Sequence, residues 1–136
     1  MLNLVRKEID GQQVFDVEFM ATSELVDAST AAAATLVYAT LFTDARAPDG
    51  RVADGARGWW DNPDAGCGLW YVRRQALGSA ARAEAVDVVR DALLALAPAL
   101  SDVRVVDVTP AGTVSVVSLE VSGQHNGQSF SIGLTL

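Results

Sequence analysis

Residues 79–100, SAARAEAVDVVRDALLALAPAL, decide the fold, because they carry the clearest helical pattern in the chain. Large apolar residues recur at steps of three and four, and the charged residues lie off that stripe, as in an amphipathic helix packed on a core. Ser79 is the expected N-cap, and Pro98 ends the helix because its ring clashes with a helical turn. The stripe consists of Val86, Val89, Leu93, Leu96 and Leu100.

Three strands are predicted after this helix, over residues 103–108, 113–122 and 128–136. The last two are joined through Asn126-Gly127, a pair that accepts the positive φ angles of a tight hairpin. His125, beside them, is expected to be a solvated turn residue. The middle strand changes phase between Val116 and Val117, which indicates a bulge or burial on both faces.

The C-terminal end of the chain is nearly uncharged. Glu120 is the only formal charge between residues 108 and 136, and the last strand has no Lys, Arg or Pro to protect an edge. Either this hairpin is covered within the fold, or its edge accepts a strand from a partner. In the second case the expected interface residues are Phe130 and Ile132, which share one face of the last strand with Leu134 and Leu136.

The N-terminal half supplies a hairpin and a second helix. Phe15, Val17 and Phe19 alternate with polar residues, and a preceding extended segment is joined to them through Asp10-Gly11. Residues 27–43 favour a helix through their alanine run, although the residues that end this segment prefer strands. The chain as a whole, residues 1–136, is therefore predicted to be a single α+β domain. Its antiparallel sheet packs with one long and one shorter helix, beside a Trp-rich loop.

The Trp-rich segment begins as a turn-rich loop over residues 44–68, with two Pro, five Gly and the turn dipeptides Asp49-Gly50 and Asp54-Gly55. Trp59 and Trp60 lie within it, and Trp70 follows and is expected to open another strand. We expect at least one indole to pin the loop to the core and at least one to contact another protein. A carbohydrate-binding platform of stacked rings is the alternative.

Composition excludes several classes of function. The formal charge of −7 repels nucleic acid and anionic membranes, and the longest apolar run, residues 31–42, is too short to span a bilayer. Residues 1–11 lack the continuous apolar region of a signal peptide. A single cysteine, Cys67, forms no internal disulfide, and no spacing predicts a metal site or a cofactor.

No group of residues predicts catalysis, so the chain is expected not to be an enzyme. A hydrolase of glycosidic bonds, such as a peptidoglycan hydrolase, would need two facing carboxylates, which could come from Glu24, Glu84, Glu120 or the loop aspartates. None of these acids is distinguished by its surroundings in the sequence.

Three blocks in fixed order resemble a known family: LFTDARA at residues 41–47, RGWWD at residues 57–61 and GCGLW at residues 66–70. From about residue 28 to the C-terminus, the chain is similar to the baseplate wedge proteins of Mu-like contractile phage tails. These are relatives of the sheath-initiating wedge subunit of larger contractile machines. The pattern departs at Ala45, where the family commonly has Arg, and between Trp60 and Asp61, where it has an additional Gly.

The resemblance implies a structural role in the virion tail baseplate, for a protein made in the bacterial host cytoplasm. Relatives often carry Glu-Pro-Arg at the strand after the long helix, and Asp102-Val103-Arg104 occupies that position here. The implied partners are other wedge proteins and the tail sheath protein, in sixfold arrangement, with tube or hub proteins as further candidates. The expected interface residues are Trp59, Trp60, Asp61, Trp70, Asp102, Arg104, Phe130 and Ile132.

Overall fold

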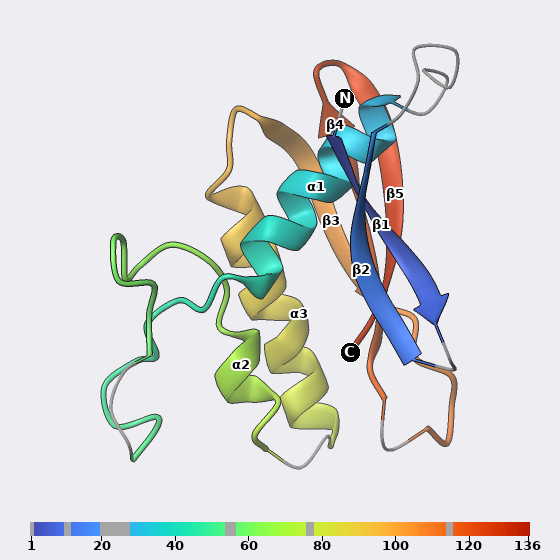
Figure 1. The fold of residues 1–136 in the computed structure, drawn as a ribbon. Helices are drawn as coiled ribbons and strands as arrows, with labels where there is room; N and C mark the ends of the chain where they lie inside the picture. Colours follow the sequence, from blue (N-terminus) through green and yellow to red (C-terminus); the bar gives the residue numbers. More distant parts are fainter. Residues whose placement is uncertain (1, 10–11, 20–27, 54–56, 76–77, 114–115) are drawn as a thin grey trace.

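The computed structural model describes residues 2–9, 12–19, 28–53, 57–75, 78–113 and 116–136. It confirms the predicted α+β class (Figure 1). The elements, in chain order, are β1 (Leu2–Ile9), β2 (Gln12–Phe19), α1 (Ala28–Phe42), α2 (Leu69–Val72), α3 (Ser79–Leu94), β3 (Leu100–Asp107), β4 (Ser118–His125) and β5 (Gln128–Thr135).

The strands form two antiparallel sheets, where the sequence predicted one. β1 pairs with β2 along their whole length, with Leu2 opposite Phe19, which confirms the N-terminal hairpin. The proposed turn at Asp10-Gly11 lies outside the described residues. The second sheet has the order β3-β4-β5, so that β4 is its central strand and β5 lies at an edge.

The β4–β5 hairpin turns as its sequence predicts. Asn126 and Gly127 have φ angles of 51° and 78°, and both are positive as a two-residue hairpin turn of type I′ requires. The prediction placed His125 in the turn itself, whereas this residue is the last of β4 and pairs with Gln128 across the turn. Its half-buried ring places Nδ1 2.9 Å from the carbonyl oxygen of Ala99.

The predicted start of the middle strand is also wrong, since β4 begins at Ser118. Val116 precedes the strand, and Val114 lies outside the described residues. The break in the apolar pattern between Val116 and Val117 therefore lies before β4 and not within it. Val117 is buried and exchanges two backbone hydrogen bonds with Leu136. The bulge lies on β3, where the register slips between Ser101 and Arg104.

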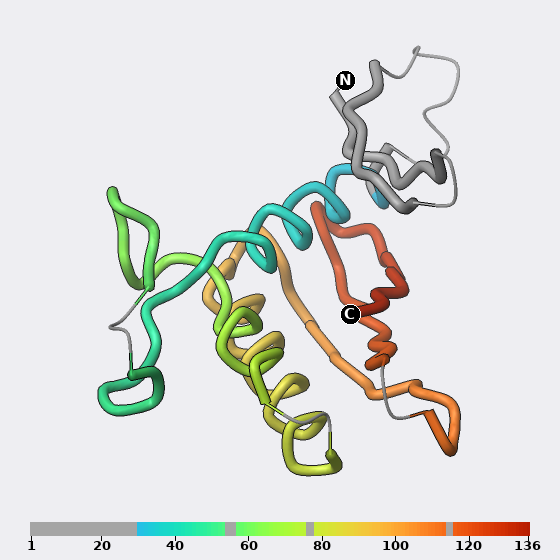
Figure 2. The backbone as a smooth tube through the Cα atoms, turned by 60° about the horizontal axis from the view of Figure 1, so that its bottom comes forward, coloured from blue at the N-terminus to red at the C-terminus, as the bar shows by residue number. Residues whose placement is uncertain are grey.

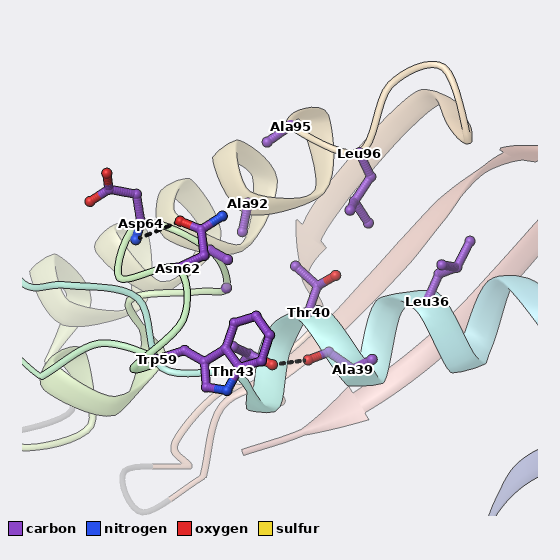
Figure 3. A pocket seen from close by; sticks show the side chains of 12 residues that line it. Leu36, Ala39, Thr40, Thr43, Trp59, Asn62, Asp64, Ala92, Ala95 and Leu96 are labelled. Atoms are coloured by element: carbon purple, nitrogen blue, oxygen red, sulfur yellow. Dashed lines mark hydrogen bonds between the residues drawn. The ribbon is translucent and has the colours of Figure 1, made fainter.

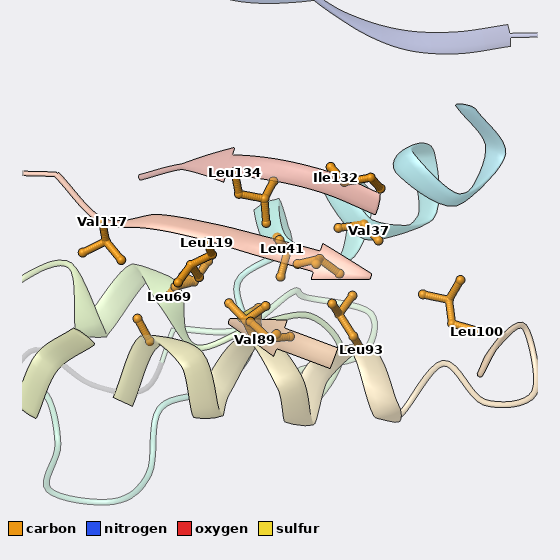
Figure 4. Close-up of a cluster of buried hydrophobic side chains, with 14 of the residues drawn as sticks. Val37, Leu41, Leu69, Val89, Leu93, Leu100, Val117, Leu119, Ile132 and Leu134 are labelled. Atoms are coloured by element: carbon orange, nitrogen blue, oxygen red, sulfur yellow. The ribbon is translucent and has the colours of Figure 1, made fainter. Parts of the chain in front are cut away.

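The core lies between the β3-β4-β5 sheet and the two long helices, which pack on the same face of it (Figures 1 and 4). The prediction of a helix over residues 27–43 is confirmed by α1, which contains no charged residue. The described helices are less unequal than predicted, with α1 and α3 of 15 and 16 residues. The core includes Ala33, Val37 and Leu41 of α1, Ala85, Val89 and Leu93 of α3, and Leu119, Val121, Phe130, Ile132 and Leu134 of the sheet.

The boundaries and buried face of α3 differ from the predicted ones. The N-cap position is held by Gly78, without a side-chain cap, and Ser79 is already helical. The helix ends at Leu94, before Pro98 can act, and Leu100 belongs to β3. The buried stripe runs through Ala81, Ala85, Val89 and Leu93, while Val86 and Leu96 are half-buried. In the described part of the chain, no helix has the length and apolar character needed to cross a membrane.

The neighbouring leucines at the end of α3 give a matched test of this packing. Leu93 is fully buried and Leu94 is 50% exposed. We expect Leu93→Ala to lower the free energy of unfolding by about 2–5 kcal/mol, because it removes buried methyl groups and leaves a cavity. Leu94→Ala should change it by less than about 1 kcal/mol. Urea unfolding of both variants checks the packing, and equal losses would contradict it.

Candidate protein-interaction site

The long loop is closed at its base by backbone contacts between its two ends. The N–H of Cys67 donates to the carbonyl of Thr43 at 2.8 Å, and the N–H of Arg46 donates to that of Pro63 at 2.7 Å. Gly66 lies so close to Thr43 that an added Cβ would stand 2.1 Å from the Thr43 carbonyl oxygen. From this neck, residues 44–53 and 57–65 extend away from the sheet (Figure 2).

Trp70 fastens the neck to the body of the protein. Its indole N–H donates to the carbonyl of Ala45 at 2.7 Å, and the guanidinium carbons of Arg57 and Arg74 lie 5.5 and 5.2 Å from the ring centroid. The predicted strand at Trp70 is wrong, because residues 69–72 form the one-turn helix α2. The expectation that one indole pins the loop is confirmed by Trp70, which is half-buried.

An ion-pair network anchors the first half of the loop. Both carboxylate oxygens of Glu84 lie 2.6 Å from a guanidinium nitrogen of Arg51, and Gln75 donates to one of them at 2.7 Å. Arg51 also lies over the ring of Tyr71, 5.7 Å from its centroid. The sequence offered no local signal for this network, because its members lie up to 33 positions apart. A second pair, Arg57–Asp44 at 3.0 Å, links the two halves of the loop.

The tip of the loop presents the other two indoles. Trp60 is 86% exposed, whereas Trp59 is 44% exposed and lines a groove beside α1. Their rings meet in a T-shaped, edge-on arrangement, with the ring centroids 6.0 Å apart and an angle of 64° between the ring planes. Such an angle does not provide the flat double platform that a stacked sugar needs. Asp61 is exposed beside them.

The turn dipeptides of the loop have different outcomes. Asp49-Gly50 forms a turn, with a φ of 75° at Gly50 and a hydrogen bond from Arg51 N–H to the carbonyl of Pro48 at 3.0 Å. Asp54-Gly55 lies outside the described residues.

The β3 edge of the sheet has features that discourage pairing with another strand. Asp102 sits at the bulge with a positive φ of 51°, which is uncommon for a residue other than glycine. Asp102, Arg104 and Asp107 are all exposed on this strand. Bulges and charges are the usual protection of sheet edges.

The β5 edge has none of these features. Val117 and Leu136 exchange both hydrogen bonds of a pair, and bonded pairs alternate along an antiparallel ladder. The register therefore directs the backbone groups of Ser129, Ser131, Gly133 and Thr135 away from β4. The side chains of these residues are small, uncharged and exposed. Within the described residues, no strand pairs with this edge.

Phe130 and Ile132 point the other way. Their side chains are 4% and 7% exposed and belong to the core of the chain itself. Any contact of this strand with a partner is therefore made by the main chain and by the small residues between them. This burial contradicts the prediction that the side chains of Phe130 and Ile132 contact a partner.

Two of the candidate catalytic carboxylates contact other side chains. The Glu84 carboxylate is held by Arg51, that of Glu120 accepts a hydrogen bond from Ser131 at 3.1 Å, and Glu24 lies outside the described residues. Cys67 is 1% exposed, and burial raises the pKa of its thiol to about 11. No cluster of His, Cys, Asp and Glu suited to a metal ion occurs among the described residues.

The chain thus combines an α+β fold, an aromatic loop held at its neck by Trp70 and a β5 edge without charged side chains. Residues 33–129, well over half of the chain, match the family described as Phage protein GP46. The chain therefore belongs to this family of phage proteins. No curated protein and no solved structure shows significant similarity to the chain.

The close contact at the loop neck leads to a test with two glycines. Gly66 has a φ of 100° and no room for a Cβ, whereas Gly78 has ordinary φ and nothing within 4 Å of that position. We expect Gly66→Ala to cost on the order of 3 kcal/mol of stability, because the neck must open. Gly78→Ala should be nearly neutral. Thermal unfolding compares them, and a stable Gly66→Ala variant with the native loop would refute the tight neck.

The buried thiol adds a dependence of stability on pH. Its pKa rises from 9.0 to about 11 on folding, mainly because burial disfavours the thiolate. Above pH 9 the unfolded chain loses this proton while the folded chain keeps it, so stability should fall from about pH 9 to about pH 11. The fall should be on the order of 2–3 kcal/mol. Urea unfolding of wild type and Cys67→Ala isolates it, and parallel pH profiles would contradict the assignment.

Proposed function

We propose that this chain is a non-catalytic structural subunit of a contractile phage tail baseplate, where it joins wedge subunits and helps to anchor the tail sheath. Its membership of a phage protein family supports this role in general terms. The observation that carries the specific proposal is the unprotected edge of β5, which stands in one sheet with the protected edge of β3.

The β5 edge suits a strand supplied by the sheath protein. The outward backbone groups of Ser129, Ser131, Gly133 and Thr135 offer a ladder of donors and acceptors. Their small side chains leave a neighbouring backbone free to approach. Each hydrogen bond contributes only about 1 kcal/mol net, so several must form together, and this makes attachment depend on register.

The remaining exposed residues suit contacts with wedge neighbours. Trp60 and Asp61 lie at the tip of a loop that is held rigidly at its neck, and Asp102 and Arg104 are exposed on the β3 strand. An exposed indole on a fixed support loses little freedom when it becomes buried in an interface. We assign these surfaces to wedge proteins, with tube or hub proteins as further candidates, in a sixfold arrangement around the tail.

The role is geometric. A subunit that holds wedge proteins at its loop and a sheath strand at β5 fixes the register of the first sheath ring relative to the baseplate. The packed core between these surfaces transmits displacement, because close-packed interiors have low compressibility. A change of baseplate shape would therefore reach the sheath through this chain without any bond being made or broken in a substrate.

A proline at Ser131 tests the edge. The N–H of Ser131 points away from β4, so Ser131→Pro removes a donor that the folded chain does not use internally. Ser131→Ala is the matched control, because it also loses the hydrogen bond to Glu120 but keeps the N–H. In the phage that encodes the chain, we expect Ser131→Pro to reduce sheathed tails roughly tenfold or more, and Ser131→Ala to assemble normally.

Electron microscopy of particles measures this outcome, and circular dichroism of the purified variants verifies that both still fold. Normally sheathed tails with Ser131→Pro would overturn the assignment of β5. Loss of tails with both variants would place the defect in the side chain rather than in strand pairing.

A further inference from the structure

A groove of about 510 Å³ lies between the C-terminal halves of α1 and α3 (Figure 3). On one side its wall includes Ala39 and Thr40 of α1 and Thr43 directly after it, and on the other it includes Ala92 of α3 and the C-cap residue Ala95. These positions recur at steps of three and four, so each helix presents one continuous face to the groove. All five side chains are short, which leaves space for another backbone to approach closely.

The ends of the groove carry larger apolar groups. Leu36 and Leu96 lie toward one end, and Trp59 from the loop lies toward the other, beside Thr43 (Figure 3). From Leu36 to Thr43 the α1 wall is about 10 Å long, or two helical turns. The lining is mostly apolar, so its occupant must bury apolar surface rather than satisfy many hydrogen bonds.

The helix that forms one wall is not built to face water on this side. α1 carries no charged residue at any of its 15 positions, yet Ala39, which lines the groove, is exposed. A helix that is apolar all round is normally covered on more than one face. Its Val37 and Leu41 belong to the core, whereas Leu36, Ala39 and Thr40 line the groove.

The electrostatics of the groove favour a basic partner. Asp64 is the only charged residue in the lining, and Asp61 lies close to it in the loop. Neither α1 nor α3 has a basic residue in its last turn, so neither helix places a cation of its own last turn beside the partial negative charge of its C-terminus. Lysines or arginines on an occupant would supply that cation.

We propose that this groove binds a short amphipathic helix of another protein, with an apolar stripe in the groove and lysine or arginine residues beside it. Two helical walls of small residues match the helix-in-groove mode of recognition, in which side chains spaced three and four apart insert between the walls. The groove is separate from the β5 edge, and the proposal does not depend on the tail role or on strand addition.

The probe is a synthetic helical peptide of about 15 residues, with leucines at steps of three and four flanked by lysines. Nuclear magnetic resonance of the ¹⁵N-labelled protein should show saturable shifts at Ala39, Ala95 and the Trp59 indole. Ala39→Trp fills the groove and should weaken binding roughly tenfold or more. Ala83→Trp, at an exposed position of α3 outside the groove, is the matched control and should leave binding unchanged.

Charge reversal gives a second readout. Asp64→Lys should weaken binding of the lysine-flanked peptide and strengthen that of a glutamate-flanked version, whereas Asp49→Lys, in an exposed turn, should do neither. Absence of saturable binding, or equal binding by wild type and Ala39→Trp, would overturn the proposal. Concentration-dependent self-association of the chain that Ala39→Trp abolishes would also overturn it, by assigning the groove to a second copy.

Discussion

The aromatic loop depends on one close approach, the passage of Gly66 against the carbonyl oxygen of Thr43. Closing a loop of this length costs conformational entropy, and the neck offsets that cost with backbone hydrogen bonds and the indole bond from Trp70 to Ala45. Because the neck joins the end of α1 to the start of α2, it also fixes how the loop lies against the helices. Trp59 can therefore line the groove while Trp60 stays exposed, although they are adjacent in sequence.

The two edges of the β3-β4-β5 sheet differ for reasons that are visible in single residues. On β3, the bulge at Asp102 and three charged side chains interrupt the regular row of backbone groups. On β5, a strict alternation of buried apolar and exposed small residues keeps that row straight. The same alternation that packs Phe130, Ile132 and Leu134 into the core therefore leaves the outward residues small. The stability of the core and the openness of the edge come from one pattern.

Sequence reasoning predicted the parts of the fold that rest on local chemistry. Asn126-Gly127 gave the hairpin, the alanine run gave α1, and alternating apolar residues gave β5. It failed where tertiary contacts decide. The aromatic and β-branched residues 70–72 prefer strands, but the contacts of Trp70 and the turn beginning at Gly68 hold them in α2. The alternation along β5 correctly placed Phe130 and Ile132 on one face of the strand. It could not show that this face packs inside the protein. The alanines of the groove could not be recognised from the sequence, because they form a common surface only where α1 and α3 lie side by side.

α1 connects the surfaces on which the two proposals rest. Val37 and Leu41 pack in the core with Ile132 and Leu134 of β5, while Ala39 and Thr40 of the same helix line the groove. A helix cannot shift one face without moving the other, so an occupant that spreads the groove must displace α1 against the sheet. Interiors packed at high density resist continuous deformation, so a displacement is either absorbed at the groove or passed on to β5 as a whole. In the second case, binding at the groove and strand pairing at β5 would be energetically coupled, and each would change the affinity of the other by the same factor.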